Sequence, residues 1–210
     1  MGYKVGMIRF RNADGIPVTS AKLNYSGAFE EVKRVVDYVY EKYVRKDDHK
    51  KNNHTRLYMY GCSAGATCIS LYMANYADDA NKKLDGCALF GTPWDIKGGE
   101  SKFFGNFWGI YPWVFGLSLN EETRKNILPK MKKYLSEEDY QEYKRVLDTN
   151  RQGMDTLNRG VYRKMFGFKT HEELLEYMTI GDKVKNIKVP TFNLSAKNDQ
   201  VCDDSFVPRR

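Results

Sequence analysis

One serine of the sequence lies in a pattern that can support nucleophilic catalysis. The run Gly61-Cys62-Ser63-Ala64-Gly65 has the form Gly-x-Ser-x-Gly, which is typical of a tight, strained turn from a strand into a helix. The turn exposes the serine Oγ, and the positive end of the helix favours nearby negative charge. We expect small residues at 61 and 65 because bulk there would clash. The pattern predicts Ser63 as nucleophile and the Ala64 N–H as an oxyanion donor; the alternative is an idle serine in a glycine-rich turn.

A carboxylate that could orient a catalytic base lies near the end of the sequence. A nucleophilic serine needs a base, usually a histidine held by an acid, and in this architecture the chain order is Ser, acid, His. Asp199 fits the acid because it follows a predicted strand, at the carboxyl edge where sites form. The alternative is an ordinary turn aspartate. Asp203 and Asp204 are nearby competitors, displaced from the strand end.

The base itself does not appear where this order requires it. The histidines are His49, His54 and His171, and none follows Asp199. His49 and His54 fall in a polar, mixed-charge run, and His171 opens a predicted helix. We expect all three to be solvated surface residues, and the catalytic triad to be incomplete in this sequence.

Alternating strands and helices must position these residues. Short β-branched and aromatic runs predict strands over 3–10, 56–60, 84–90 and 188–196. Apolar residues spaced by three and four predict a helix over 27–45, and a mostly buried helix follows over 66–76. This β-α-β-α-β order implies an α/β fold with a mostly parallel sheet flanked by helices.

Residues 94–186 interrupt the alternation and predict a helical lid or insertion on the sheet. Ser136 to Asp139 has the composition of a helix start. Aromatic residues are dense between Phe103 and Phe115, where they could line an apolar pocket, face a membrane or simply pack on the sheet. We expect one domain over 1–210, of which this insertion is a part.

Composition narrows the classes of protein and of partner. Of the 210 residues, 34 are basic and 27 acidic, a formal charge of +7, but the basic residues are spread out and no nucleic-acid-binding motif occurs, so we expect no nucleic-acid partner. The four cysteines form no C-x-x-C pair and predict free thiols, without a metal or disulfide framework.

No apolar run reaches the roughly 18–20 residues of a membrane span, and no secretory segment begins the sequence. We therefore expect a location in the cytoplasm or at the periphery of an intracellular membrane.

Several of these runs together resemble one group of α/β-hydrolases. The residues from Leu57 to Thr67 resemble the nucleophile region of the AB hydrolase 4 family, which includes lipid-directed esterases and fungal medium-chain fatty acid ethyl ester synthases. Further similar stretches are Pro93-Trp94-Asp95, Phe166-Gly167-Phe168 with Glu176-Tyr177, 187–201, and the loop 15–20 with Leu23. The resemblance spans nearly the whole chain in the expected order.

The resemblance implies an α/β-hydrolase fold in which Ser63 is the nucleophile and Asp199 the acid. It implies a serine esterase or lipase-like enzyme acting on short- to medium-chain fatty acyl esters, with alcohol acyl transfer as a variant and no cofactor. The family's Asn-x-Arg-Gly motif is replaced here by Phe10 to Asp14. The segments that supply the second oxyanion donor and the catalytic histidine have no counterpart, so we expect a partial sheet and a truncated member. The alternative is an inactive relative that acts as a binding module.

Overall fold

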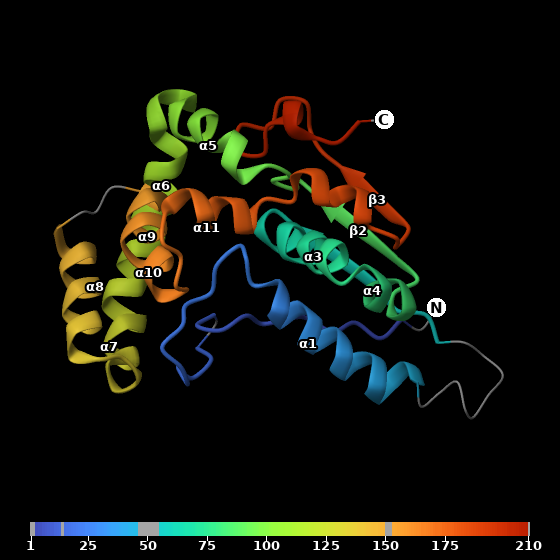
Figure 1. Cartoon of the computed structure of the whole chain (residues 1–210), viewed down its shortest axis with the longest axis horizontal. Helices are drawn as coiled ribbons and strands as arrows, with labels where there is room; N and C mark the ends of the chain where they lie inside the picture. Colours follow the sequence, from blue (N-terminus) through green and yellow to red (C-terminus); the bar gives the residue numbers. More distant parts are fainter. Residues whose placement is uncertain (1–2, 14, 46–54, 150–152, 210) are drawn as a thin grey trace.

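The computed structural model of the chain is mixed α/β, with a small parallel sheet flanked by helices (Figure 1). It describes residues 3–13, 15–45, 55–149 and 153–209. In these residues the sheet has the order β1-β2-β3, with β1 at Tyr58–Cys62, β2 at Gly86–Phe90 and β3 at Thr191–Leu194. Both strand pairs are parallel, and Cys62, Phe90 and Leu194 lie in register. All three strands therefore end at one edge.

The helices predicted on either side of β1 are confirmed. The first consists of α1, Phe29–Val39, and a π-helical turn η1, Tyr40–Val44. Its apolar stripe buries Val32 and Val36, as the spacing predicts. The second is α3, Ala64–Asn75, which is buried from Ala66 to Ala74 because it lies between α1 and the sheet (Figure 1). A further helix, α4 at Ala77–Lys83, carries the chain back towards β2.

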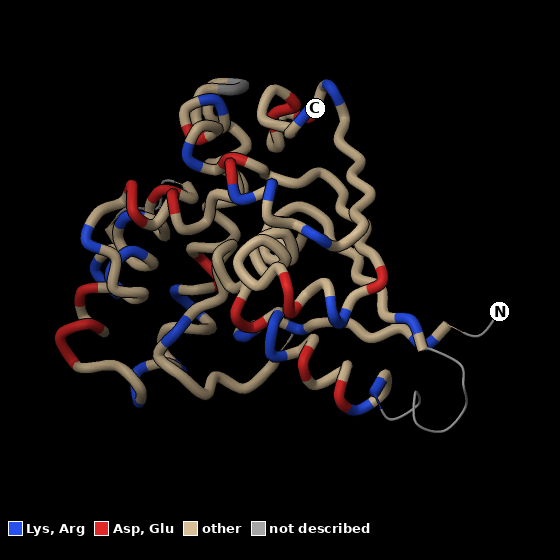
Figure 2. The backbone as a smooth tube through the Cα atoms, turned by 45° about the vertical axis from the view of Figure 1, so that its right-hand side comes forward, with Lys and Arg blue, Asp and Glu red and all other residues tan. Residues whose placement is uncertain are grey.

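Ion pairs tie α1 to α4 outside the apolar core. The Lys83 ammonium lies 2.5 Å from a carboxylate oxygen of Asp37 on α1 and 2.5 Å from one of Asp79 on α4. Lys33 adds a 2.8 Å contact to Asp37. Figure 2 shows the same mixing of basic and acidic residues along the backbone elsewhere.

The two faces of the sheet differ in their surroundings. On the helix side, Leu89 of the central strand β2 is fully buried in the core that includes α3. On the other side, alternate residues of the edge strands are exposed; they are Tyr58, Tyr60, Phe192 and Leu194. Phe90 joins them through ring contacts at 5.1 Å with Tyr60 and 6.2 Å with Phe192. The described residues thus leave an aromatic sheet face open to solvent.

The strand predicted over residues 3–10 is wrong. These residues run as an irregular segment, and Tyr3, Val5 and Met7 are 79%, 92% and 84% exposed. The sequence pattern is typical of a strand paired within a sheet. Among the residues that the structure describes, however, no strand lies beside this segment. Without a partner, its backbone takes no ladder hydrogen bonds and its apolar side chains gain no burial.

The segment between β2 and β3 is helical, as predicted. Its elements are α5 Ile96–Gly105, η2 Asn106–Gly109, α6 Ile110–Glu122, η3 Thr123–Ile127, α7 Leu128–Met131, η4 Lys132–Tyr134, α8 Glu137–Thr149, α9 Gly153–Leu157, η5 Asn158–Tyr162, α10 Arg163–Met165, α11 His171–Met178 and η6 Gly181–Asn186; η7 Asp204–Phe206 follows β3. The predicted helix start at Ser136 is confirmed, because the Asp139 N–H donates to the Ser136 hydroxyl at 3.1 Å.

This helical segment has its own apolar core. Met131, Leu147, Leu157 and Leu174 are buried in it. Helices α6 and α9 approach so closely that a Cβ on Gly116 would overlap the backbone of Gly153. The Asn120 side chain also donates to the Gly153 carbonyl at 3.0 Å. Backbone contact of this kind requires glycine at position 116.

Candidate active site

Ser63 lies in a strained turn between β1 and α3. Its φ of 50° and ψ of −127° place a non-glycine residue in a region that L-residues rarely adopt. The turn is held from both sides: the Ser63 N–H donates to the Phe90 carbonyl at 2.9 Å, and the Ser63 carbonyl accepts from the Thr67 N–H at 3.1 Å. Strain that the surroundings enforce at an exposed serine is typical of a nucleophile position.

The two glycines of the turn have different surroundings. A Cβ on Gly61 would lie 2.7 Å from the Ile69 side chain and 3.0 Å from the Ala66 backbone, so this position requires glycine, as predicted. A Cβ on Gly65 would meet nothing within 4 Å. The expectation of a clash at residue 65 is therefore wrong, because this position faces open space instead of the turn.

Ala64, the predicted oxyanion donor, follows Ser63 directly. It opens α3, so its N–H belongs to the first helical turn, which has no acceptor within the helix. The partial positive charge of the helix N-terminus is concentrated at these groups. An oxygen that becomes negative beside Ser63 would be stabilised there.

Asp199 lies at the same sheet edge, in the turn after β3. Its Oδ1 accepts backbone N–H groups from Val201 at 2.8 Å and Cys202 at 2.9 Å. Its Oδ2 faces Gly91 at the end of β2, 3.6 Å from where a Cβ on that glycine would stand. The two backbone bonds fix the carboxylate and leave Oδ2 as the oxygen that can accept another donor.

One strand separates the serine from the aspartate. Ser63 follows β1 and Asp199 follows β3, with β2 between them. Two strand spacings place the backbones of these strand ends about 10 Å apart.

Asp203 and Asp204, the alternative acids, have other partners. Asp203 accepts from the Ser205 N–H at 2.7 Å and pairs with Lys102 at 2.9 Å. These hydrogen bonds lower its pKa to about 2. Asp204 forms an ion pair with Arg209. Both residues therefore stabilise the segment after Asp199.

Cys202 adds a buried thiol beside the carboxylate. Its Sγ lies 2.9 Å from the Gly91 carbonyl. Burial raises its pKa to about 12, and the Asp199 carboxylate and Cys62 contribute in the same direction. The thiol therefore stays protonated and acts as a packing group.

A cavity of about 430 Å³ opens at Ser63. Ser63, Ala64 and Gly65 form part of its wall. Apolar side chains of the helical segment form much of the rest; they include Phe103, Phe104, Phe115, Leu119, Met154, Tyr162, Leu175 and Met178. Part of the aromatic stretch thus lines a pocket, whereas Trp108 and Trp113 are 98% and 52% exposed.

The Pro93-Trp94-Asp95 run joins the sheet to this cavity wall. The buried Trp94 accepts the backbone N–H groups of Ile180 at 3.1 Å and Gly181 at 3.0 Å through its carbonyl. The Asp95 carboxylate accepts the Gly98 N–H at 2.7 Å and so caps the start of α5. The run fixes where α5 leaves the sheet.

The expectation that His171 is a solvated surface residue is wrong. His171 opens α11, as predicted, but its side chain is only 5% exposed. Its Nε2 lies 2.5 Å from a carboxylate oxygen of Glu100 on α5. Nothing near residue 171 in the sequence signals this partner, which tertiary packing alone supplies. His171 is not among the residues that line the cavity at Ser63, and His49 and His54 lie outside the described residues.

Comparison with known proteins gives no match to a family model, to a curated protein or to a solved structure.

Proposed function

We propose that this chain carries the nucleophile and the acid of a serine hydrolase of the α/β-hydrolase class, acting on short- to medium-chain fatty acyl esters. The observation that carries the proposal is the strained Ser63 turn, which opens onto a largely apolar cavity. An acyl chain would lie among the aromatic and aliphatic side chains of the helical segment, which then acts as a lid. The resemblance of the motifs to the AB hydrolase 4 family supports the same class.

The chemistry follows from the placement of these groups. Ser63 Oγ attacks the ester carbonyl and passes its proton to a base, while the Ala64 N–H stabilises the oxyanion that forms. The alcohol leaves with a proton, and an acyl-serine remains. Water attacks this intermediate in hydrolysis; an alcohol that attacks it instead gives acyl transfer.

The base is the part of this mechanism that the described residues do not place beside Ser63. Asp199 holds one carboxylate oxygen ready for an imidazole. His171 does not line the cavity and is bound to Glu100, which does. The competing function is a binding module that keeps the cavity without the catalysis.

Chemical rescue with imidazole distinguishes the serine hydrolase from the binding module. We expect added imidazole to raise hydrolysis of a p-nitrophenyl butyrate or octanoate in a saturable manner above the solution background. Ser63→Ala should lose this increase, whereas Ser26→Ala, on the wall of the same cavity, should retain it. A fluorophosphonate should leave its adduct on the peptide that contains Ser63. Equal rescue in Ser63→Ala would contradict the proposal; no rescue and no adduct in a cooperatively folded chain would support the binding module.

We also propose that the protein meets its substrate at a membrane surface. It would either bind there from the cytoplasm or stay at the periphery of an intracellular membrane. Exposed apolar side chains gather on η2 and α6; they are Trp108, Ile110, Trp113, Val114, Phe115 and Leu119. Phe115 and Leu119 also line the cavity, so the exposed patch continues into the pocket. Tryptophan is enriched at membrane interfaces. None of the helices within the described ranges has the length and apolarity to cross a bilayer.

Vesicle sedimentation tests this contact. A Trp108→Ala/Trp113→Ala variant should lose most of its binding to phosphatidylcholine vesicles. The matched control is Tyr58→Ala/Tyr60→Ala, which removes two exposed aromatics from the sheet face instead. Equal loss in both variants would indicate non-specific adsorption.

A further inference from the structure

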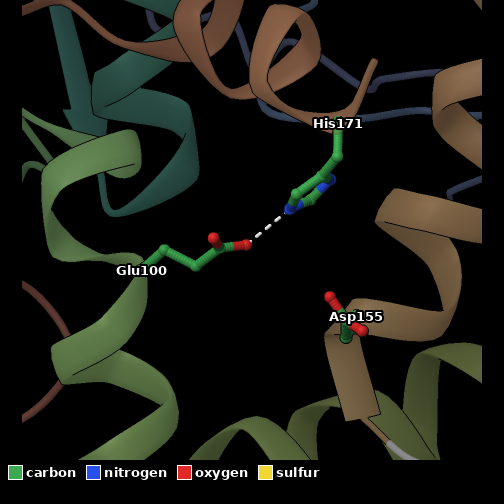
Figure 3. Close-up of side chains that lie close together, drawn as sticks. All are labelled: Glu100, Asp155 and His171. Carbon is green, nitrogen blue, oxygen red and sulfur yellow. Dashed lines mark hydrogen bonds and ion pairs between the residues drawn. The ribbon is translucent and has the colours of Figure 1, made fainter.

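Three helices of the segment between β2 and β3 bring together side chains that commonly bind metal ions. Glu100 comes from α5, Asp155 from α9 and His171 from the start of α11 (Figure 3). One potential ligand atom from each lies within 4.8 Å of the other two. These residues are far apart in the sequence, which explains why cysteine and histidine spacing alone predicts no metal site.

The histidine of this cluster is buried beside one of the two carboxylates. Its side chain is 5% exposed, and Nε2 points towards Glu100 and the space shared with Asp155 (Figure 3). Its Nδ1 is buried and has no hydrogen-bond partner among the described residues. Nε2 is therefore the ring nitrogen that faces the carboxylates and that a metal ion would take.

The charge around the histidine is mainly negative. Glu100 and Asp155 contribute two carboxylates, and the nearby Glu172 interacts electrostatically with both His171 and Arg159. Arg159 compensates in part, with Nε 2.5 Å from Asp155 and a terminal nitrogen 3.9 Å from Glu100. The Arg159 side chain is 51% exposed, so it can turn into solvent when another cation takes its place.

We propose that Glu100, Asp155 and His171 form a site for a divalent transition-metal ion of the zinc type. Imidazole nitrogen and carboxylate oxygen suit Zn²⁺, and water would complete a tetrahedral set. On binding, the metal replaces the bond from Nε2 to Glu100, and the proton that Nε2 carried passes to Nδ1 or to solvent. The Asp155 side chain is 41% exposed, which leaves the site accessible from outside.

A metal here would join three helices that each carry part of the cavity wall, α5, α9 and α11. Phe103 and Phe104 lie on α5 beside Glu100 and line the cavity at Ser63. Fixing α5 to α9 and α11 would therefore limit movement of that wall. The site itself does not depend on the proposed esterase activity.

Competition between the full 210-residue chain and a chromophoric zinc chelator tests the proposal. We expect one Zn²⁺ per chain, a higher melting temperature with Zn²⁺, and visible d–d absorption with Co²⁺. His171→Gln should weaken binding at least tenfold, and so should Asp155→Asn, whose exposed side chain poses little risk to folding. Arg159→Gln should tighten binding about fivefold because the metal no longer displaces a cation.

Two control variants exclude other ligands. His49→Gln/His54→Gln removes the remaining imidazoles, and Cys62→Ser removes the exposed thiol; both should bind Zn²⁺ as the parent does. Circular dichroism checks that each variant is folded. Unchanged binding in both Asp155→Asn and His171→Gln, loss of binding in either control, or no binding by the parent chain would each overturn the proposal.

Discussion

The backbone N–H of Ser63 donates to the carbonyl of Phe90 at 2.9 Å, so the serine remains hydrogen-bonded to the sheet after β1 has ended. This bond and the first turn of α3 together hold φ at 50°. The sheet and the helix thus maintain a conformation that the residue would avoid alone.

Replacing Ser63 by glycine should therefore stabilise the fold while removing the nucleophile. Glycine adopts positive φ without a Cβ clash, and relief of the strain should add about 1 kcal/mol to the free energy of unfolding. Ser63→Ala keeps the Cβ and should show no such gain. Urea denaturation of the two variants measures the difference, and equal stabilities would mean that the turn is unstrained.

The two glycines of the turn should respond differently to alanine. Gly61→Ala places a Cβ against the Ala66 backbone and Ile69 and should cost about 1–3 kcal/mol of folding free energy. Gly65→Ala meets open space and should change the free energy by less than about 0.5 kcal/mol. Thermal unfolding of both proteins checks this, and a large loss at residue 65 would contradict the described turn.

Contact between α6 and α9 should be sensitive to a single methyl group. Gly116→Ala inserts a Cβ into the Gly153 backbone and should destabilise the chain by about 3 kcal/mol, the upper part of the overpacking range. Gly105→Ala, with nothing within 4 Å of its Cβ, is the control. Tolerance of Gly116→Ala would show that the two helices separate easily.

Asp203 should make stability depend on pH under acid conditions. Its hydrogen bonds lower the folded-state pKa to about 2 from an ordinary 3.8. The stabilisation is therefore complete above about pH 4 and is lost as the pH falls towards 2. Asp203→Asn should cost about 0.5–1 kcal/mol at pH 7, in the range of a helix cap, and should approach the parent's stability as the pH falls. Urea unfolding of the parent and of Asp203→Asn at several pH values tests this.

Local patterns in the sequence are sufficient to predict the elements around Ser63. Three patterns depend only on residues that are close in the sequence. They are the Gly-x-Ser-x-Gly run, the apolar stripe that includes Val32 and Val36, and the buried run after Ala66. The positions of Ser63 and Asp199 at one sheet edge follow from a parallel α/β arrangement.

Features that depend on distant residues could not be predicted in this way. The burial of His171 results from α5, which is 71 residues away at Glu100. The apolar run from Tyr3 has a strand's composition, but strand formation requires a neighbour that composition cannot supply. The contrast between Gly61 and Gly65 depends on which side of the turn faces α3, information that a pentapeptide does not contain.

The open space beside Gly65 makes this residue a natural position for a reporter group. A cysteine introduced there would point into the cavity entrance without disturbing the serine turn. Cys62, the exposed native thiol, would first be replaced by serine, and the remaining three cysteines are buried. An environment-sensitive dye on residue 65 would then signal occupancy of the cavity by any ligand, whether or not the chain turns it over.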